Sequence, residues 1–152
     1  MGNAGEEIRI RPMEKKDAFK VYRIEKECFS DPWAESVFEN FQNEKNQFFF
    51  VAEEKDILGY GTVMTVLDEC EILRVAVDKS ARRKGIGYNL LKEMTEFAKA
   101  RGAKLFYLEV RESNKAALGM YEKYGFLESG RRKGYYCSPK EDAILMSLIT
   151  EV

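Results

Sequence analysis

The sequence predicts an α/β (α+β) fold in which helices cover both faces of a mixed, mostly antiparallel central sheet. Short turns join successive candidate strands before residue 78, which is typical of antiparallel hairpins. A strand–helix–strand–helix–strand succession begins at residue 71 and adds parallel strands to the same sheet. No repeat, low-complexity segment or linker divides the 152 residues, so we expect a single domain over 1–152.

Hydrophobic periodicity assigns the elements of the first half of the chain. Ile8 and Ile10 lie on one side of an alternating stretch, and the next segment has apolar residues at helical spacing. Ser30-Asp31-Pro32 ends that helix because proline cannot continue it, and Glu54-Lys55-Asp56 is a hairpin turn. The expected elements are a strand over 7–12, helices over 15–29 and 34–41, and strands over 48–53 and 57–67.

The second half begins with a β-branched run that predicts a buried strand. The helix that opens at Gly85 has one apolar stripe and stops at Arg101-Gly102, and Ser113-Asn114 is a natural N-cap for the next helix. The expected elements are a strand over 71–77, a helix over 85–101, a strand over 105–110, a helix over 114–124, and strands over 127–130, 134–137 and 143–148.

The chain contains no histidine, and this excludes several kinds of site. Ser-His and Cys-His nucleophilic couples need an imidazole, as does any His-ligated metal site. We therefore expect no metal, and general acid–base chemistry must come from Glu, Asp, Tyr, Lys or Cys. A covalent route through Cys137 has no histidine to activate the thiol.

Charge and cysteine content limit the partners and the compartment. The net charge of −1 argues against a broad nucleic-acid surface, and no run of about 18 apolar residues offers a membrane span. The three cysteines are odd in number, far apart and without C-x-x-C spacing. Reduced cysteines of this kind are typical of a cytoplasmic protein.

A basic, glycine-containing turn connects the strand over 71–77 to the helix that follows it. Arg82-Arg83-Lys84 precedes Gly85-Ile86-Gly87, so backbone N–H groups, side-chain charge and the helix dipole all favour a phosphorylated ligand. A dinucleotide-binding motif would need a third glycine where Leu90 stands. An ordinary solvated basic loop is the alternative interpretation.

These residues resemble a known family. Arg82-x-x-Gly85-x-Gly87 after Val75-Ala76-Val77 is similar to the acetyl-CoA motif R/Q-x-x-G-x-G/A of the GNAT superfamily of N-acetyltransferases. Five further segments resemble the ribosomal-protein-alanine acetyltransferase (RimI) branch of that superfamily, in the same order and over nearly the whole chain. They are Asp31-Pro32-Trp33, the segments 108–117 and 121–126, Arg132-Lys133-Gly134-Tyr135-Tyr136, and the segment 141–146.

The resemblance implies a fold in which two neighbouring parallel strands splay apart beside the cofactor. It implies that the pantetheine arm of acetyl-CoA bonds to Val75 and Val77, that the pyrophosphate rests on N–H groups from Arg83 to Tyr88, and that Asn114 contacts the cofactor from the next helix. The implied acetyl-CoA site comprises Val75, Ala76, Val77, Arg82, Arg83, Lys84, Gly85, Ile86, Gly87, Tyr88 and Asn114.

Glu109 is the candidate catalytic base. Alternation along 105–111 places Tyr107, Glu109 and Arg111 on one face of the strand, opposite Phe106 and its apolar neighbours. A partly desolvated carboxylate beside the splay is suited to proton abstraction through a water, and the resemblance implies the same role. A salt-bridged carboxylate on an exposed sheet face is the alternative.

Tyr121 is the candidate acid that protonates the leaving thiolate. The helical pattern alone favours core packing for this tyrosine, because Ala117, Met120 and Tyr124 share its stripe. The resemblance matches Tyr121 rather than Tyr124 and implies the catalytic role.

The acceptor side of the site is less strongly indicated. The resemblance implies that Trp33, Tyr135 and Tyr136 line a peptide groove, although ordinary packing accounts for loose aromatic residues equally well. Arg74 stands where the family pattern has asparagine, and Lys79 where it often has proline. Arg74 would face the acceptor or pair with a nearby acid such as Glu71.

The expected activity is acetyl-CoA-dependent acetylation of the N-terminal α-amine, alanine, of a ribosomal protein by direct attack. At pH 7 roughly one α-amine in seven is neutral, against roughly one lysine in 2,500, a difference of roughly 3.5 kcal/mol. The alternatives are acetylation of a lysine or a small amine, and a non-catalytic CoA-binding module. We expect a monomer or weak dimer in the cytoplasm, with no nucleic-acid or membrane partner.

Overall fold

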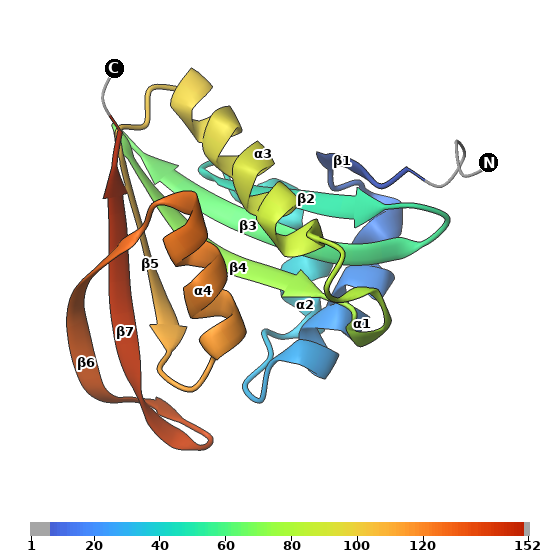
Figure 1. Ribbon diagram of the computed structural model, residues 1–152. Helices are drawn as coiled ribbons and strands as arrows, with labels where there is room; N and C mark the ends of the chain where they lie inside the picture. Colours follow the sequence, from blue (N-terminus) through green and yellow to red (C-terminus); the bar gives the residue numbers. More distant parts are fainter. Residues whose placement is uncertain (1–6, 151–152) are drawn as a thin grey trace.

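The protein is described by a computed structural model over residues 7–150, so both ends of the predicted 1–152 domain lie outside the described residues. A single seven-stranded sheet has the order β1-β2-β3-β4-β5-β7-β6 (Figure 1). Only β4 and β5 are parallel neighbours, and every other pair of adjacent strands is antiparallel. The predicted mixed, mostly antiparallel sheet is confirmed.

The elements follow the sequence patterns closely in their order. The strands are β1 Arg9–Pro12, β2 Gln47–Glu53, β3 Ile57–Val66, β4 Glu69–Val77, β5 Leu105–Arg111, β6 Leu127–Cys137 and β7 Lys140–Ile149. The α-helices are α1 Ala18–Cys28, α2 Glu35–Glu39, α3 Ile86–Ala100 and α4 Lys115–Tyr124. Short 3-10 turns cover Lys15–Asp17, Phe41–Asn43 and Lys79–Ala81.

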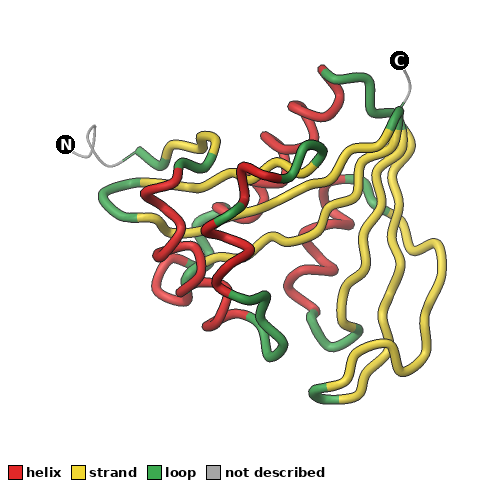
Figure 2. Tube along the Cα trace, turned by 180° about the vertical axis from the view of Figure 1, so that it is seen from behind, coloured by secondary structure: helices red, strands yellow, loops and turns green. Residues whose placement is uncertain are grey.

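The two faces of the sheet are covered differently. α3 and α4 lie on one face, over the buried side chains Phe106, Leu108 and Val110 of β5 (Figure 1). α1 and α2 lie on the other face and cover the part of the sheet nearer β2, β3 and β4 (Figure 2). Within the described residues, that second face carries no helix over β5, β7 and β6, so Glu109 and its neighbours remain accessible there.

The two parallel strands separate halfway along their length. β4 and β5 pair from Glu69↔Leu105 to Ile72↔Leu108, and their remaining residues have no partner in the other strand. β4 continues to Val77 and β5 to Arg111, so the last part of each strand borders a gap in the sheet. The splayed central strands implied by the family resemblance are confirmed.

The C-terminal strands differ from the prediction. The strands expected over 127–130 and 134–137 are one continuous strand, β6, and the strand expected from residue 143 begins at Lys140. The β6–β7 register shifts between Glu128 and Gly130 and again between Arg132 and Tyr136. A glycine inside a strand often marks a bulge. The sequence alone does not distinguish such a bulge from a turn that separates two strands.

Candidate active site

A pocket of about 820 Å³ opens beside the free edge of β4, and residues from the start of α3 and from α4 line it. Its lining includes all but one of the residues predicted to bind acetyl-CoA. These are Val75, Ala76, Val77, Arg82, Arg83, Gly85, Ile86, Gly87, Tyr88 and Asn114. Lys84 does not line the pocket, so the predicted basic triplet contributes two of its three residues.

The N-terminus of α3 supplies backbone donors to this pocket. The first hydrogen bond of the helix runs from the Asn89 N–H to the Gly85 carbonyl, at 3.0 Å. The backbone N–H groups of residues 86–88 therefore have no acceptor within the helix. No side chain of the described residues caps this end. Gly85 has a φ of 76°, a left-handed conformation that favours glycine. These donors and the helix dipole suit an anion such as a pyrophosphate.

A glycine is required at position 87 because neighbouring side chains lie close to its Cα, and not because of its backbone conformation. A Cβ at this position would meet the Met120 sulfur at 3.1 Å and the side chains of Val75 and Val77 at 3.6 Å. All three neighbours line the pocket. The missing side chain therefore leaves room where the turn faces the strand, and the residues present fit the phosphorylated, extended shape of acetyl-CoA.

The edge of β4 that faces the gap is partly occupied by side chains. The Asp78 N–H donates to the Leu58 carbonyl of β3, so alternation turns the N–H and C=O groups of Val77 and Val75 towards the gap. The Val77 carbonyl accepts hydrogen bonds from Arg82 Nε at 3.1 Å and from the Cys28 thiol at 3.4 Å. The side chain of Arg82, predicted to neutralise phosphate, thus binds the last carbonyl of β4.

The N-cap and the length of α4 complete the pocket. Asn114 is the N-cap of α4, and its Oδ1 accepts a hydrogen bond from the Ala117 N–H at 3.1 Å. Lys123 also lines the pocket and lies 4.8 Å from the centre of the Tyr88 ring. Lys123 is a cation that the sequence analysis missed, because it comes from a helix far from the glycine turn in the sequence.

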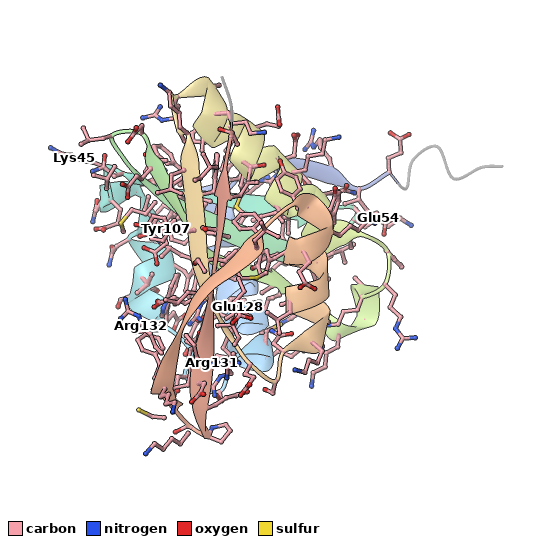
Figure 3. The ribbon with its side chains drawn as sticks, turned by 60° about the vertical axis from the view of Figure 1, so that its left-hand side comes forward. Lys45, Glu54, Tyr107, Glu128, Arg131 and Arg132 are labelled. Atoms are coloured by element: carbon pink, nitrogen blue, oxygen red, sulfur yellow. The ribbon has the colours of Figure 1, made fainter. Side chains whose placement is uncertain are left out.

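Glu109 lies on the open face of β5, as alternation predicted. Its Oε2 atom is 3.0 Å from Nε of Arg132, which lies on β6. The Glu109 side chain is 22% exposed and that of Arg132 is 59% exposed. In Figure 3, Arg132 and Tyr107 lie on this side of the sheet, whereas Arg131 and Glu128 lie on the side of α4. The candidate base is therefore accessible and ion-paired, as the alternative interpretation expected.

The charge of Glu109 influences its neighbours. Burial raises the pKa of Glu71 on β4, and the Glu109 carboxylate raises it further. The same carboxylate is the main cause of the raised pKa of Tyr135, to which burial adds. Glu71, Glu109 and Tyr135 thus form a small cluster of ionisable side chains that extends from β4 to β6.

Tyr121 is buried, with 6% of its surface exposed, and its ring meets the ring of Phe126 edge-on at 5.8 Å. Burial raises its pKa well above the ordinary value for tyrosine, and the nearby Tyr136 adds to the shift. The phenol therefore keeps its proton throughout the neutral range. Tyr121 does not line the pocket, and its packing also fits the core role that the helical pattern favoured.

The predicted acceptor aromatics lie on the open face. Trp33 lies in the connection between α1 and α2, and its ring stacks on that of Phe38 with 6.1 Å between the ring centres. Tyr135 and Tyr136 come from β6, and their ring centres are 5.1 Å apart. None of the three lines the pocket beside β4. They come from two segments that lie on the side of the sheet opposite α3 and α4.

Comparison with known proteins identifies the family. Residues 18–126 match the model of the Acetyltransferase (GNAT) family. The chain belongs to the GNAT family. Members of this family use acetyl-CoA, which agrees with the pocket at the start of α3. The predicted resemblance to the superfamily and to its ribosomal-protein-alanine branch is confirmed.

Individual relatives agree with this GNAT assignment over most of the chain. A ribosomal protein bS18-alanine N-acetyltransferase of Escherichia coli is 35% identical over 141 residues, which is 91% of this chain and 95% of the relative. The crystal structure of the Escherichia coli ribosomal-protein-S18-alanine N-acetyltransferase superposes with a TM-score of 0.86 at 32% identity and covers 96% of each chain. Arabidopsis thaliana NAA60 in complex with acetyl-CoA shares the fold, with a TM-score of 0.86 at 20% identity, 94% coverage of this chain and 98% of that chain.

Arg74, which departs from the GNAT pattern, does not pair with Glu71. Its guanidinium lies 2.9 Å from the fully buried carboxylate of Glu25 on α1. The same carboxylate accepts hydrogen bonds from the Tyr60 hydroxyl at 2.5 Å and from the Trp33 N–H at 2.8 Å. Arg74 also lies over the Trp33 ring at 4.5 Å. Arg74 therefore anchors the α1–α2 turn, a role that depends on contacts across the fold.

No helix within residues 7–150 is long and apolar enough to cross a membrane. The same residues contain no group of three or more Cys, Asp or Glu side chains placed to hold a metal ion.

Proposed function

We propose that this GNAT protein transfers the acetyl group of acetyl-CoA to the N-terminal α-amine, that of alanine, of a ribosomal protein. The observation that carries the proposal is the gap that begins after Ile72 and Leu108. The acetyl-CoA pocket lies at the β4 edge of this gap, and Glu109 lies on the strand at its other edge. The 35% identical relative is named for the same reaction.

Acetyl-CoA would be held by the backbone more than by side-chain charge. The N–H groups of residues 86–88 and the α3 dipole would hold the pyrophosphate. Arg83 and Lys123 add positive charge at the pocket wall. The outward-turned N–H and C=O groups of Val75 and the N–H of Val77 would bond the extended arm as if it were a further strand, which would direct the thioester into the gap.

Acetyl-CoA supplies an activated acetyl group on a thiol leaving group. Glu109 takes the proton of the acceptor amine, through a water where the distance requires it, so that the neutral amine attacks directly. Tyr121 keeps its proton at neutral pH and gives it to the departing thiolate. Arg132, beside Glu109, disfavours a second positive charge and so favours the neutral amine.

The open face over β5 to β7 would receive the acceptor. Trp33 on one side and Tyr135 and Tyr136 on the other would line the groove. A single carboxylate is sufficient to deprotonate an α-amine, because the pKa of an α-amine is about 2.6 units below that of a lysine side chain. We place the reaction in the cytoplasm and expect no nucleic-acid or membrane partner and a monomer or weak dimer.

The test uses one peptide that carries both a free N-terminal alanine and an internal lysine. The peptide is incubated with the protein and acetyl-CoA, and the acetyl group is located by fragmentation mass spectrometry. Acetylation of the α-amine is the expected result. Modification of lysine alone would contradict the proposal, and acetyl-CoA binding without transfer to any amine would indicate a non-catalytic CoA-binding module.

A further inference from the structure

Arg111 lies two residues after Glu109 on the same open face of β5, at the edge of the gap. Its side chain is 22% exposed and does not line the acetyl-CoA pocket. Its guanidinium contacts two loops that are more than 100 residues apart in the sequence. These loops are the α1–α2 turn and the β6–β7 turn.

The contacts to the α1–α2 turn come from one end of the guanidinium. Nη2 of Arg111 donates to the Ser30 hydroxyl at 3.2 Å and lies 3.6 Å from Oδ2 of Asp31. Arg74 on β4 reaches the Asp31 carbonyl at 3.5 Å. Arginines from the two splayed strands thus hold the same two-residue turn above the gap.

The contacts to the β6–β7 turn are more numerous. Arg111 donates to the carbonyls of Pro139 at 2.9 Å and Ser138 at 3.3 Å. Nη1 lies 3.1 Å from Oε1 of Glu141, and Oε2 of the same carboxylate accepts the Ser113 N–H at 2.5 Å. The guanidinium also lies over the Tyr136 ring at 4.4 Å. One planar group with five donors can make all these contacts, whereas a lysine cannot.

We propose that Arg111 is a positioning residue for the acceptor, because it fixes the separation of the two loops that border the open face. Trp33 lies in the first loop and Tyr136 lies on β6 just before the second, so Arg111 sets the distance between the aromatic walls of the groove. This inference rests on the proposed function in so far as the groove receives an amine acceptor.

The location of Arg111 predicts which kinetic constant changes. None of its partners lines the acetyl-CoA pocket, so the affinity for acetyl-CoA should be unchanged. A misplaced groove wall should raise the KM for the peptide about tenfold in Arg111→Gln, and kcat should change less. Arg111→Lys should show the same loss, since an ammonium is a point charge that cannot bridge both loops.

Arg131→Gln is the matched control. Arg131 also makes two ion pairs, to Glu112 and Asp142, but it lies on the α4 side of the sheet. A peptide KM within twofold of that of the unsubstituted protein in both Arg111 variants would overturn the proposal. An equal rise in the KM for acetyl-CoA would also overturn it, because general loosening of the fold produces that result.

Two measurements test, without any activity assay, whether Arg111 holds the two loops in place. Trp33 is the only tryptophan of the chain, so its fluorescence reports on the α1–α2 turn. The Ser113 amide reports on the other loop, because its acceptor Glu141 is held by Arg111. Arg111→Gln should shift the emission to longer wavelength and speed exchange of the Ser113 amide, and Arg131→Gln should do neither. If both signals stay unchanged, the proposed role of Arg111 in holding the two loops is refuted. A failure to acetylate any peptide would refute only the proposed function.

Discussion

Glu109 and Arg132 form an ion pair across the open face of the sheet, with 3.0 Å between Oε2 and Nε. The two residues lie on β5 and β6, on either side of β7. Because Arg132 is more exposed than Glu109, an amine that approaches the carboxylate must pass or displace the guanidinium. The pair therefore links the candidate base to the way in which the acceptor reaches it.

Glu109→Gln should lower kcat by about 10²- to 10⁴-fold, the usual contribution of a general base. The loss should be greatest at low pH, where more of the acceptor amine is protonated. The acetyl-CoA dissociation constant, measured by calorimetry, should stay within about twofold because Glu109 is outside the pocket. Glu128→Gln, on the other face, is the control. A pH–rate profile identical to that of the unsubstituted protein would remove Glu109 as the base.

Tyr121→Phe should lower kcat by about tenfold or more while the free energy of unfolding changes by less than about 1 kcal/mol. Phenylalanine keeps the edge-on contact with Phe126 and removes only the proton donor. Tyr124→Phe is the matched control, because the Tyr124 hydroxyl bonds to Thr95 and its loss should reduce stability rather than rate. If Tyr121→Phe retains full kcat, Tyr121 is a core residue only.

Two glycine variants should separate ligand binding from stability. Gly87→Ala places a methyl group against Met120, Val75 and Val77 and should weaken acetyl-CoA binding about tenfold with little change in unfolding. Gly85→Ala meets no atom within 4 Å but must adopt a φ of 76°, so it should destabilise the fold by about 1 kcal/mol. Calorimetry and denaturant titration of both variants check this. The prediction fails if Gly87→Ala binds acetyl-CoA normally.

Glu53→Gln should destabilise the protein at neutral pH and lose this effect in acid. The hydrogen bond from Arg11, at 2.9 Å, and that from Arg9 lower the pKa of Glu53 from 4.5 to about 2. A lowered folded-state pKa means that the stabilisation is present above 4.5 and is lost as the pH falls towards 2. Thermal midpoints of both proteins should therefore converge over that window. The exposed Glu93 of α3 offers a control substitution, and a constant difference across the window would contradict the assignment.

Local sequence patterns determined most of the elements, the side of β5 on which Glu109 lies, and the position of the glycine turn. The alternation in β5 places Glu109 opposite Phe106, Leu108 and Val110, and the Gly85–Gly87 turn ends at the N-terminus of a helix. These features depend on residues close together in the chain, where side-chain periodicity and glycine content act directly. The predicted turn lines the pocket, but the rest of the lining comes from β4, α4 and the end of α1, which only the tertiary structure brings together.

Only the tertiary structure decided the partners of the charged side chains. Arg82 braces the Val77 carbonyl, Arg74 pairs with Glu25, and Glu109 pairs with Arg132. Arg111 joins two loops from opposite ends of the chain. Long charged side chains reach several neighbours within a few ångströms, and strand order and bulge positions determine which neighbour is present. Sequence spacing carries no information about that order, which is why the sequence identified the residue types of the site but not their contacts.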